Sequence, residues 1–278
     1  MTHTSRTTPA GTAMASGALT LTFLGTGTSV GVPMVGCDCA VCHSDDPRDR
    51  RFRSSVFMTS PEAQWVVDTG PDFRSQCLQA GIRRLDAVLL THAHTDHVAG
   101  FDDLRRFTVG ADQELPVHAT PSCLAAVRRM FEFAFNGENR YPGYLKPAPR
   151  PIDGPFSLGA TEVVPLPVVH GKVETLGFLF LRAGRKLVAY IPDIKSAPAS
   201  TLDALADVEV LIVDALRYTP HPTHMTFDEA LVLARDVRAA RTWFTHFQCQ
   251  VGHAEAEENL PADVRLAYDG LTLSLPIS

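Results

Sequence analysis

The sequence predicts a layered α/β protein with two β-sheets. Short apolar segments with strand character recur from residue 18 to residue 246, and amphipathic helical segments separate many of them. The strand-like segments outnumber the helical ones, which favours two sheets over one. At 278 residues and 45% hydrophobic composition, the chain is long enough to bury about three quarters of its unfolded surface. We expect a single domain from residue 18 to residue 278.

The first half of the chain is expected to begin with strands and to continue with alternating strands and helices. Residues 18–25 (ALTLTFLG) alternate apolar and polar side chains and end at a glycine, which is typical of a strand that leads into a turn. Pro71 and Gly81 bracket a helical segment, because proline is favoured in the first helical turn and glycine after the last. The expected strands are 18–25, 54–60, 64–70, 86–92 and 115–120, and the expected helices are 71–81, 98–107 and 121–135.

The second half continues this alternation after an irregular segment. Prolines and glycines interrupt any period in residues 136–155, which we expect to form a long loop that covers a pocket. Thr226 precedes a helical segment and Glu229 follows three residues later, the spacing of a capping box. The expected strands are 161–170, 175–182, 186–193, 208–215 and 241–246, and the expected helices are 199–207 and 226–240.

The composition limits the cellular locations and the classes of binding partner that we expect. The chain has 25 Lys and Arg against 31 Asp and Glu, a net charge of −6, which disfavours nucleic acid and acidic membranes as partners. No apolar stretch reaches the roughly 18 residues of a membrane span. Residues 1–17 lack the apolar core of a secretory signal and are expected to be a disordered extension, with Met14 as an alternative start. Six cysteines without such a signal indicate thiols or metal ligands and favour a cytoplasmic location.

Histidine and carboxylate residues are concentrated where predicted strands end. Strand 86–92 runs directly into His92, His94, Asp96 and His97. Alternate residues of an extended chain point the same way, so His92 and His94 can hold one ion while Asp96 and His97 face a neighbouring one. Three later apolar strands end in single candidate ligands, namely His170, Asp193 and His246. Since loops at strand ends carry the sites of α/β scaffolds, we expect the seven residues to hold two adjacent metal ions with Asp193 as the bridge.

These motifs resemble the metallo-β-lactamase superfamily over nearly all of residues 18–278. The resemblance rests on the run HAHTDH at 92–97, on Asp68 in DTG, and on the later ligands named above. It implies an αββα four-layer sandwich in which helices flank two mixed sheets. It also implies that Asp68 supports the site from beside the metals. One ion would be held by His92, His94 and His170, and the other by Asp96, His97 and His246.

A second group of candidate ligands follows the first strand. Cys37, Cys39 and Cys42 place three thiols within six residues, which is dense enough to suggest a structural zinc ion. Cys249 is the expected fourth ligand, and His253 is the alternative. Buried or redox-active thiols are the competing interpretation. The nearby glycines lack the spacing and the βαβ unit of a dinucleotide-binding loop.

The cysteine cluster resembles that of PhnP-like phosphodiesterases, which are associated with cleavage of phosphoribosyl 1,2-cyclic phosphate. In that family a histidine occupies the position of Cys249, a conservative difference for zinc. The family also places a histidine beside the substrate phosphate just before the penultimate helix. His224 matches that position, and His221 is the second candidate.

The resemblance implies hydrolysis of a small phosphodiester, above all a cyclic ribose phosphate. A metal-bridging hydroxide would attack phosphorus, and His224, with a near-neutral pKa, would be the general acid. Manganese or zinc is expected at the catalytic site, with iron or nickel also open, because such ligands select weakly among these metals.

Three other functions are compatible with parts of the sequence. A tRNA 3′-end endonuclease shares the metal motif, but no basic docking arm is evident. A thioester or lactone hydrolase and an accessory protein of PQQ biosynthesis are further alternatives. A homodimer is left open. Arg48, Arg50, Arg51 and Arg53 alternate with acidic residues and are expected to form a solvated face.

Overall fold

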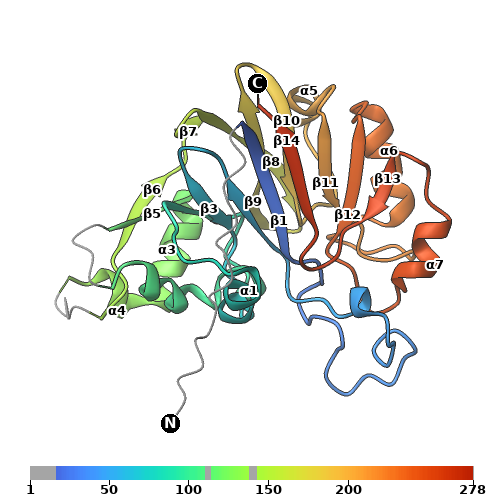
Figure 1. Cartoon of the computed structure of the whole chain (residues 1–278), viewed down its shortest axis with the longest axis horizontal. Helices are drawn as coiled ribbons and strands as arrows, with labels where there is room; N and C mark the ends of the chain where they lie inside the picture. The colour runs from blue at the N-terminus through green and yellow to red at the C-terminus, as the bar shows by residue number, and fades with distance from the viewer. Residues whose placement is uncertain (1–16, 110–113, 138–142, 278) are drawn as a thin grey trace, which may run out of the picture.

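The computed structural model describes residues 17–109, 114–137 and 143–277, which form two seven-stranded sheets packed face to face (Figure 1). In spatial order the first sheet consists of β14 (Thr272–Pro276), β1 (Ala18–Gly25), β2 (Ser55–Thr59), β3 (Gln64–Val67), β4 (Ala87–Leu89), β5 (Leu115–Ala119) and β6 (Pro147–Pro151). The second consists of β13 (Val264–Leu266), β12 (Arg241–Thr245), β11 (Val210–Asp214), β10 (Arg185–Ile191), β9 (Val173–Arg182), β8 (Thr161–His170) and β7 (Phe156–Leu158). Both sheets are mixed, as the sequence predicts.

Helices cover the outer face of each sheet. The first sheet is covered by α1 (Phe73–Ala80), the 3₁₀ helix η2 (Phe101–Phe107) and α3 (Pro121–Met130). The second is covered by α5 (Ala199–Leu205) and α6 (Phe227–Asp236), and α7 (His253–Glu258) packs near its edge. The remaining helices are η1 (Pro47–Asp49), α2 (Thr95–Val98) and α4 (Glu132–Phe135). The predicted αββα sandwich is therefore confirmed.

Central strands read as unbroken apolar runs because both of their faces are buried. In β11, Val210 and Ile212 face the core between the sheets, whereas Leu211 and Val213 face the layer of helices. β4 behaves in the same way, with Leu89 toward the other sheet and Val88 toward the helices. The three large clusters of buried hydrophobic residues correspond to the three interfaces of a four-layer sandwich.

The structure differs from the sequence-based expectation in several places. Residues 147–151 form the edge strand β6 inside the segment expected to be a loop. An edge position tolerates the prolines of this strand, because an outward-facing residue needs no N–H for the ladder. Arg51 is buried rather than solvated. Five further elements, η1, β7, β13, β14 and α7, were not predicted. Residues 1–16 of the expected disordered extension lie outside the described residues.

Strand direction brings the predicted site residues to one end of the sandwich. β3 and β4 are parallel neighbours in the first sheet, as are β10, β11 and β12 in the second. β8 runs in the direction of β10, since two antiparallel pairings separate them. The carboxyl ends of these strands lead into the candidate ligands. Across the described residues, no helix combines the length and apolarity needed to cross a membrane.

Candidate metal centre

The turn from β4 into α2 positions the first set of ligands. His94 is extended, with φ −65° and ψ 148°, and it precedes the first turn of α2. His92 Nε2 and His94 Nδ1 lie 2.8 Å apart. The ring of His170, at the end of β8, lies 5.2 Å from both of theirs. The three residues therefore converge on one point, and each can offer a ligand atom to a single ion.

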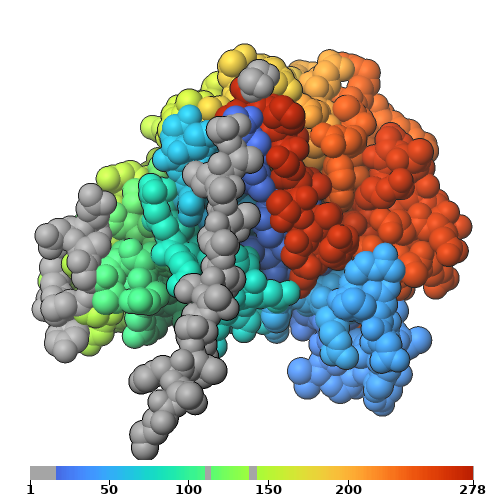
Figure 2. Space-filling model, in the orientation of Figure 1, coloured from blue at the N-terminus to red at the C-terminus, as the bar shows by residue number. Residues whose placement is uncertain are grey.

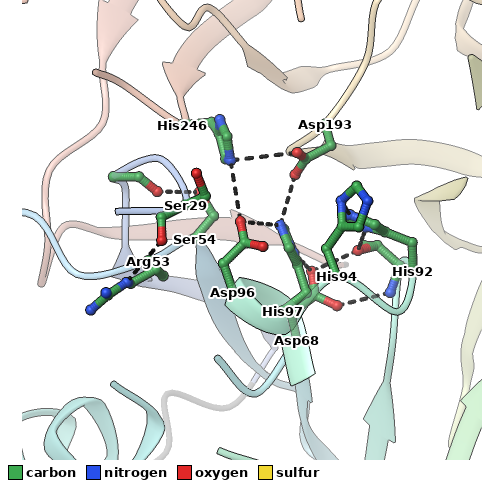
Figure 3. Close-up of polar contacts among 12 residues, drawn as sticks. Ser29, Arg53, Ser54, Asp68, His92, His94, Asp96, His97, Asp193 and His246 are labelled. Carbon is green, nitrogen blue, oxygen red and sulfur yellow. Dashed lines mark hydrogen bonds and ion pairs between the residues drawn. The ribbon is translucent and has the colours of Figure 1, made fainter. Parts of the chain in front are cut away.

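The second set is Asp96, His97 and His246, whose ligand atoms also converge. His97 Nε2 lies 3.3 Å from Asp96 Oδ2, and His246 Nε2 lies 4.0 Å from the same oxygen. Asp193 lies between the two sets. Its Oδ2 is 3.0 Å from His97 Nε2, and its Oδ1 is 3.4 Å from His246 and 3.7 Å from His170. Figure 3 shows Asp193 and Asp96 on either side of the His97 and His246 rings.

The donor atoms fit divalent metal ions. The Nε2 atoms of His97 and His246 and Oδ2 of Asp193 are buried and lie at ion-pair distance from neighbouring ligand atoms, but they make no hydrogen bond to any described residue. Burial alone would raise the pKa of Asp193, but His246 and His97 together hold that pKa well below its ordinary value. The group is therefore a carboxylate. Imidazole nitrogen and carboxylate oxygen are ligands of zinc, manganese and iron, so this cluster could hold a dinuclear centre.

Asp68 organises the first sheet's contribution without facing the ligand atoms. Its Oδ2 accepts hydrogen bonds from His97 Nδ1 at 2.8 Å and from the Thr91 hydroxyl at 2.8 Å, and its Oδ1 accepts from the Thr91 amide at 2.8 Å. Because His97 carries its proton on Nδ1, Nε2 is left for a metal. The residue has φ 66°, a left-handed backbone that an L residue adopts only when its surroundings impose it.

Two other ligand imidazoles are fixed in the same way. The Thr91 hydroxyl lies 3.0 Å from His92 Nδ1, and because its proton goes to Asp68 it accepts from His92. His170 Nδ1 donates to the main-chain oxygen of Thr223 at 2.9 Å. Sequence reasoning missed both threonines, because neither is a ligand type. Such partners set the tautomer and the orientation of metal-binding histidines.

His224 lies beside both sets of ligands. Its ring is 4.7 Å from the ring of His170 and 4.8 Å from that of His246. Its Nδ1 pairs with Oδ2 of Asp214, 2.7 Å away at the end of β11. Burial and the neighbouring His246 lower the pKa of His224 to about 3, so the near-neutral value expected from the sequence is wrong. Burial raises the pKa of Asp214 well above its ordinary range. Asp214 was also missed, although it ends an apolar strand as Asp193 does.

The four predicted cysteines converge at a separate site. Cys37, Cys39, Cys42 and Cys249 bring their sulfur atoms within 4.8 Å of one another. The Cys37 and Cys249 sulfurs are 3.9 Å apart, close to the roughly 3.8 Å expected between thiolates in a tetrahedral zinc site. A hydrogen bond from the Cys42 amide lowers the pKa of Cys39 to about 7, which favours its thiolate. His253, the alternative ligand, is not in this cluster. The site could therefore hold a structural metal.

Comparison with known proteins decides the family. The model of the beta-lactamase superfamily domain matches residues 64–247. The chain belongs to the metallo-β-lactamase superfamily. This match spans every proposed ligand of the dinuclear centre and accounts for the sandwich that carries them.

The chain is also similar to three individual proteins. The crystal structure of a new diphosphatase from the PhnP family is 37% identical and has a TM-score of 0.86, covering 93% of this chain and 97% of that one. An octanoyltransferase from Porphyromonas gingivalis is 38% identical over 254 residues, which is 90% of this chain and 50% of that protein, so the chain spans about half of its length. A coenzyme PQQ synthesis protein B from Methylorubrum populi is 31% identical over 219 residues, which is 69% of this chain and 71% of that protein.

Proposed function

We propose that this metal-dependent hydrolase is a PhnP-like phosphodiesterase that cleaves a small phosphodiester, such as a cyclic ribose phosphate. The observation that carries the proposal is the His224–Asp214 pair. The ring of His224 lies 4.7 Å from the ring of His170 and 4.8 Å from that of His246. The pair therefore provides a proton donor beside the metal centre, where a bound substrate would expel its leaving oxygen. A hydrolase of thioesters has less need of such a donor, since a thiolate leaves readily.

The residues have distinct tasks in this reaction. Two divalent ions, when bound, would polarise water and neutralise the phosphoryl oxygens. His92, His94 and His170 would hold one of them, Asp96, His97 and His246 the other, and Asp193 would contact both. Asp68 and the two threonines keep the imidazoles in the tautomer and orientation that binding needs.

The directions of the two pKa shifts suggest where the transferred proton is stored. A neutral Asp214 would donate to Nδ1 of a neutral His224, which then carries its own proton on Nε2. As the P–O bond breaks, the departing oxygen takes the Nε2 proton and Nδ1 takes the proton of Asp214. The pair thus delivers one proton and ends as a carboxylate and a neutral imidazole, without passing through an imidazolium ground state.

A diphosphatase is the second candidate, because the PhnP-family diphosphatase is similar to this chain over nearly its whole length. Both reactions break a P–O bond with the same ligands. They differ in the leaving group, since a phosphate departs readily and an alkoxide does not. A diphosphatase would therefore depend less on His224.

Turnover by the metal-characterised protein tests the proposal. The substrates are a cyclic ribose phosphate, 2′,3′- and 3′,5′-cyclic nucleotides, a bis-aryl phosphodiester, a diphosphate ester, precursor tRNA and a thioester. An Asp96→Ala variant, which lacks a proposed ligand, controls for contaminating activity. We expect cleavage of a small diester. Cleavage of the thioester alone would overturn the proposal, and cleavage of the diphosphate alone would favour the second candidate.

We also propose a third metal ion, a zinc held by the four cysteines. Cys39→Ser removes the thiolate with the lowered pKa, so the purified variant should contain about one zinc less per chain by elemental analysis. Cys77→Ser, which alters a cysteine outside the cluster, is the control. Full zinc content in the Cys39 variant would disprove the assignment.

A further inference from the structure

A buried ion pair contacts the segment that carries Cys249 and follows His246. The side chain of Arg51 is 0% exposed and that of Asp49 is 7% exposed, and Arg51 Nη2 lies 2.8 Å from Asp49 Oδ1. Removing two charges from water is costly, and apolar side chains of similar size often serve stability as well. The pair therefore calls for an explanation other than stability alone.

The contacts of Arg51 fall on the loop that follows His246. Its Nη2 donates to the oxygen of Val251 at 2.8 Å, and its Nη1 donates to the oxygen of Gln248 at 3.5 Å. The guanidinium also lies 5.1 Å from the centroid of the Phe247 ring, within cation–π range. These three residues surround Cys249 and begin directly after the proposed metal ligand.

Asp49 holds the far end of the same loop. Its Oδ1 accepts a hydrogen bond from the amide of His253 at 2.8 Å, where α7 begins. Figure 2 shows the light-blue segment around η1 lying against the red C-terminal segment, in agreement with this bond. The main chain of Arg51 in turn pairs with Val32, which precedes the three cysteines of the first loop. The pair thus links both cysteine-bearing segments.

His246 needs such support because its backbone is strained. Its φ is 64°, a left-handed conformation that a histidine keeps only when its surroundings enforce it. Two backbone bonds lie on its C-terminal side, from the Phe247 amide to the oxygen of Thr26 at 2.9 Å and from the Gln248 amide to the oxygen of Leu216 at 2.9 Å. Both hydrogen bonds form only if residues 247–251 keep their backbone conformation.

We propose that the Arg51–Asp49 pair is a positioning device for His246. By fixing residues 247–253 it holds His246 in its left-handed conformation, with Nε2 directed toward Asp96 and Asp193. The inference rests on the proposed role of His246 as a ligand of the second ion. The ion held by His92, His94 and His170 receives no ligand from this loop.

Metal binding by Arg51→Met tests the proposal without any assay of turnover. The cysteine site is kept in its zinc form, and Co²⁺ is titrated into the remaining sites while the visible spectrum and the heat of binding are recorded. We expect one Co²⁺ to bind as in the unaltered protein and the other at least tenfold more weakly, with the spectrum of a His246→Ala variant. Arg182→Met is the control for loss of an arginine ion pair outside the loop, because Arg182 pairs with the exposed Glu62 at 2.8 Å.

The outcomes separate positioning from general stability. Wild-type affinity for both cobalt ions, or equal weakening of both, would overturn the proposal. If Arg51→Met does not fold, Arg51→Lys decides the question: lysine keeps the charge but cannot reach two carbonyl oxygens, so the same selective weakening is expected, and its absence refutes the role. Fewer than two ions in the unaltered protein would refute the metal centre itself, whereas inactivity toward phosphodiesters would refute only the reaction.

Discussion

Three imidazoles of the metal centre form a hydrogen bond through Nδ1, which leaves Nε2 directed at the ligand cluster. Asp68, the Thr91 hydroxyl and the main-chain oxygen of Thr223 serve His97, His92 and His170 respectively. The clustering of these side chains could be predicted because metal-binding residue types at the ends of apolar strands are conspicuous in a sequence. The threonines could not, because their function depends on a main-chain atom or a hydroxyl that many residues also offer. Asp214 was detectable by the rule that selected Asp193.

His224→Ala should separate metal binding from proton donation. The variant is expected to keep both catalytic ions, because each proposed set of three ligands is complete without His224, even though the His224 ring also lies within ligand distance of His170 and Asp193. Its kcat/KM for an alkyl phosphodiester should fall by roughly 10²–10⁴, the usual contribution of a general acid. The loss for a nitrophenyl ester should be far smaller, since that leaving group departs as a stable anion. Equal losses on both substrates would contradict the role.

Asp269 should make stability depend on pH. Its carboxyl accepts bonds from Thr26 and from the Phe52 amide, and burial raises its pKa to about 7. The folded state therefore retains a proton that the unfolded state has released above its pKa of about 4. Stability contributed by this group is complete below pH 4 and is lost as pH rises through 7. At about 1.4 kcal/mol per pKa unit, the loss is up to about 4 kcal/mol.

Denaturant unfolding at pH 5 and pH 8 measures this effect. Asp269→Asn retains an acceptor for the Phe52 amide but does not titrate, so the drop in unfolding free energy between the two pH values should be smaller than in the unaltered protein. Asp263→Asn, at an exposed carboxyl, is the control and should change nothing. An unaltered drop in the Asp269 variant would refute the prediction.

At the scale of elements, two turns at the site end of the first sheet are packed too closely for side chains. Gly70, after β3, has no Cβ, and one placed there would lie 2.1 Å from the main-chain oxygen of Asp96 in α2. The turn that presents Asp68 thus fits directly against the helix that presents Asp96 and His97.

Helix α6, which covers the second sheet, begins with the predicted capping box, in which Thr226 and Glu229 exchange hydrogen bonds.

Gly70→Ala should displace α2 and weaken the second metal ion. Because the obstructing atom is backbone, the contact is relieved by moving the Gly70 turn and α2 apart, which we expect to displace Asp96 and His97 relative to His246. We expect at least a tenfold loss of affinity for one of two titrated Co²⁺ ions. Gly154→Ala, where a Cβ would meet nothing within 4 Å, is the control. Unchanged binding of both ions would show that the turn yields without disturbing the helix.

At the scale of the whole molecule, each ion would connect the two sheets. The first would take two ligands from the β4–α2 turn and His170 from β8, and the second would take two from α2 and His246 after β12. Metal ions that bind only the folded protein stabilise it by mass action. The centre should therefore contribute to the stability of the sandwich as well as to its chemistry.

Removal of the catalytic ions should lower the melting temperature. At free metal concentrations 100-fold above Kd, each ion adds about 2.7 kcal/mol, which corresponds to a shift of roughly 5–10 °C for a domain of this size. Calorimetry of the chelated, reloaded and untreated protein provides the comparison. A melting temperature indifferent to chelation and reloading would contradict a metal that joins the sheets.

The central strands and the fold class could be predicted because buried strands and amphipathic helices differ in period. The edges could not be predicted as readily. The proline-rich strand β6 is stabilised by its partner β5 rather than by its own residues. β14 is a strand because it pairs with β1, from Ala18 opposite Pro276 to Thr22 opposite Thr272. Such pairing between distant segments has no signature within the segment itself.

The separation of these partner segments along the chain also determines the order in which the protein can assemble as it leaves the ribosome. His92, His94 and His97 emerge early during synthesis, but neither proposed ion would gain its full ligand set until β8 and then β12 have been translated. The first sheet in turn lacks its outermost strand until residues 272–276 have appeared. We therefore predict that metal loading is a late event, because an incomplete nascent chain would expose these histidines without the residues that complete either proposed ligand set.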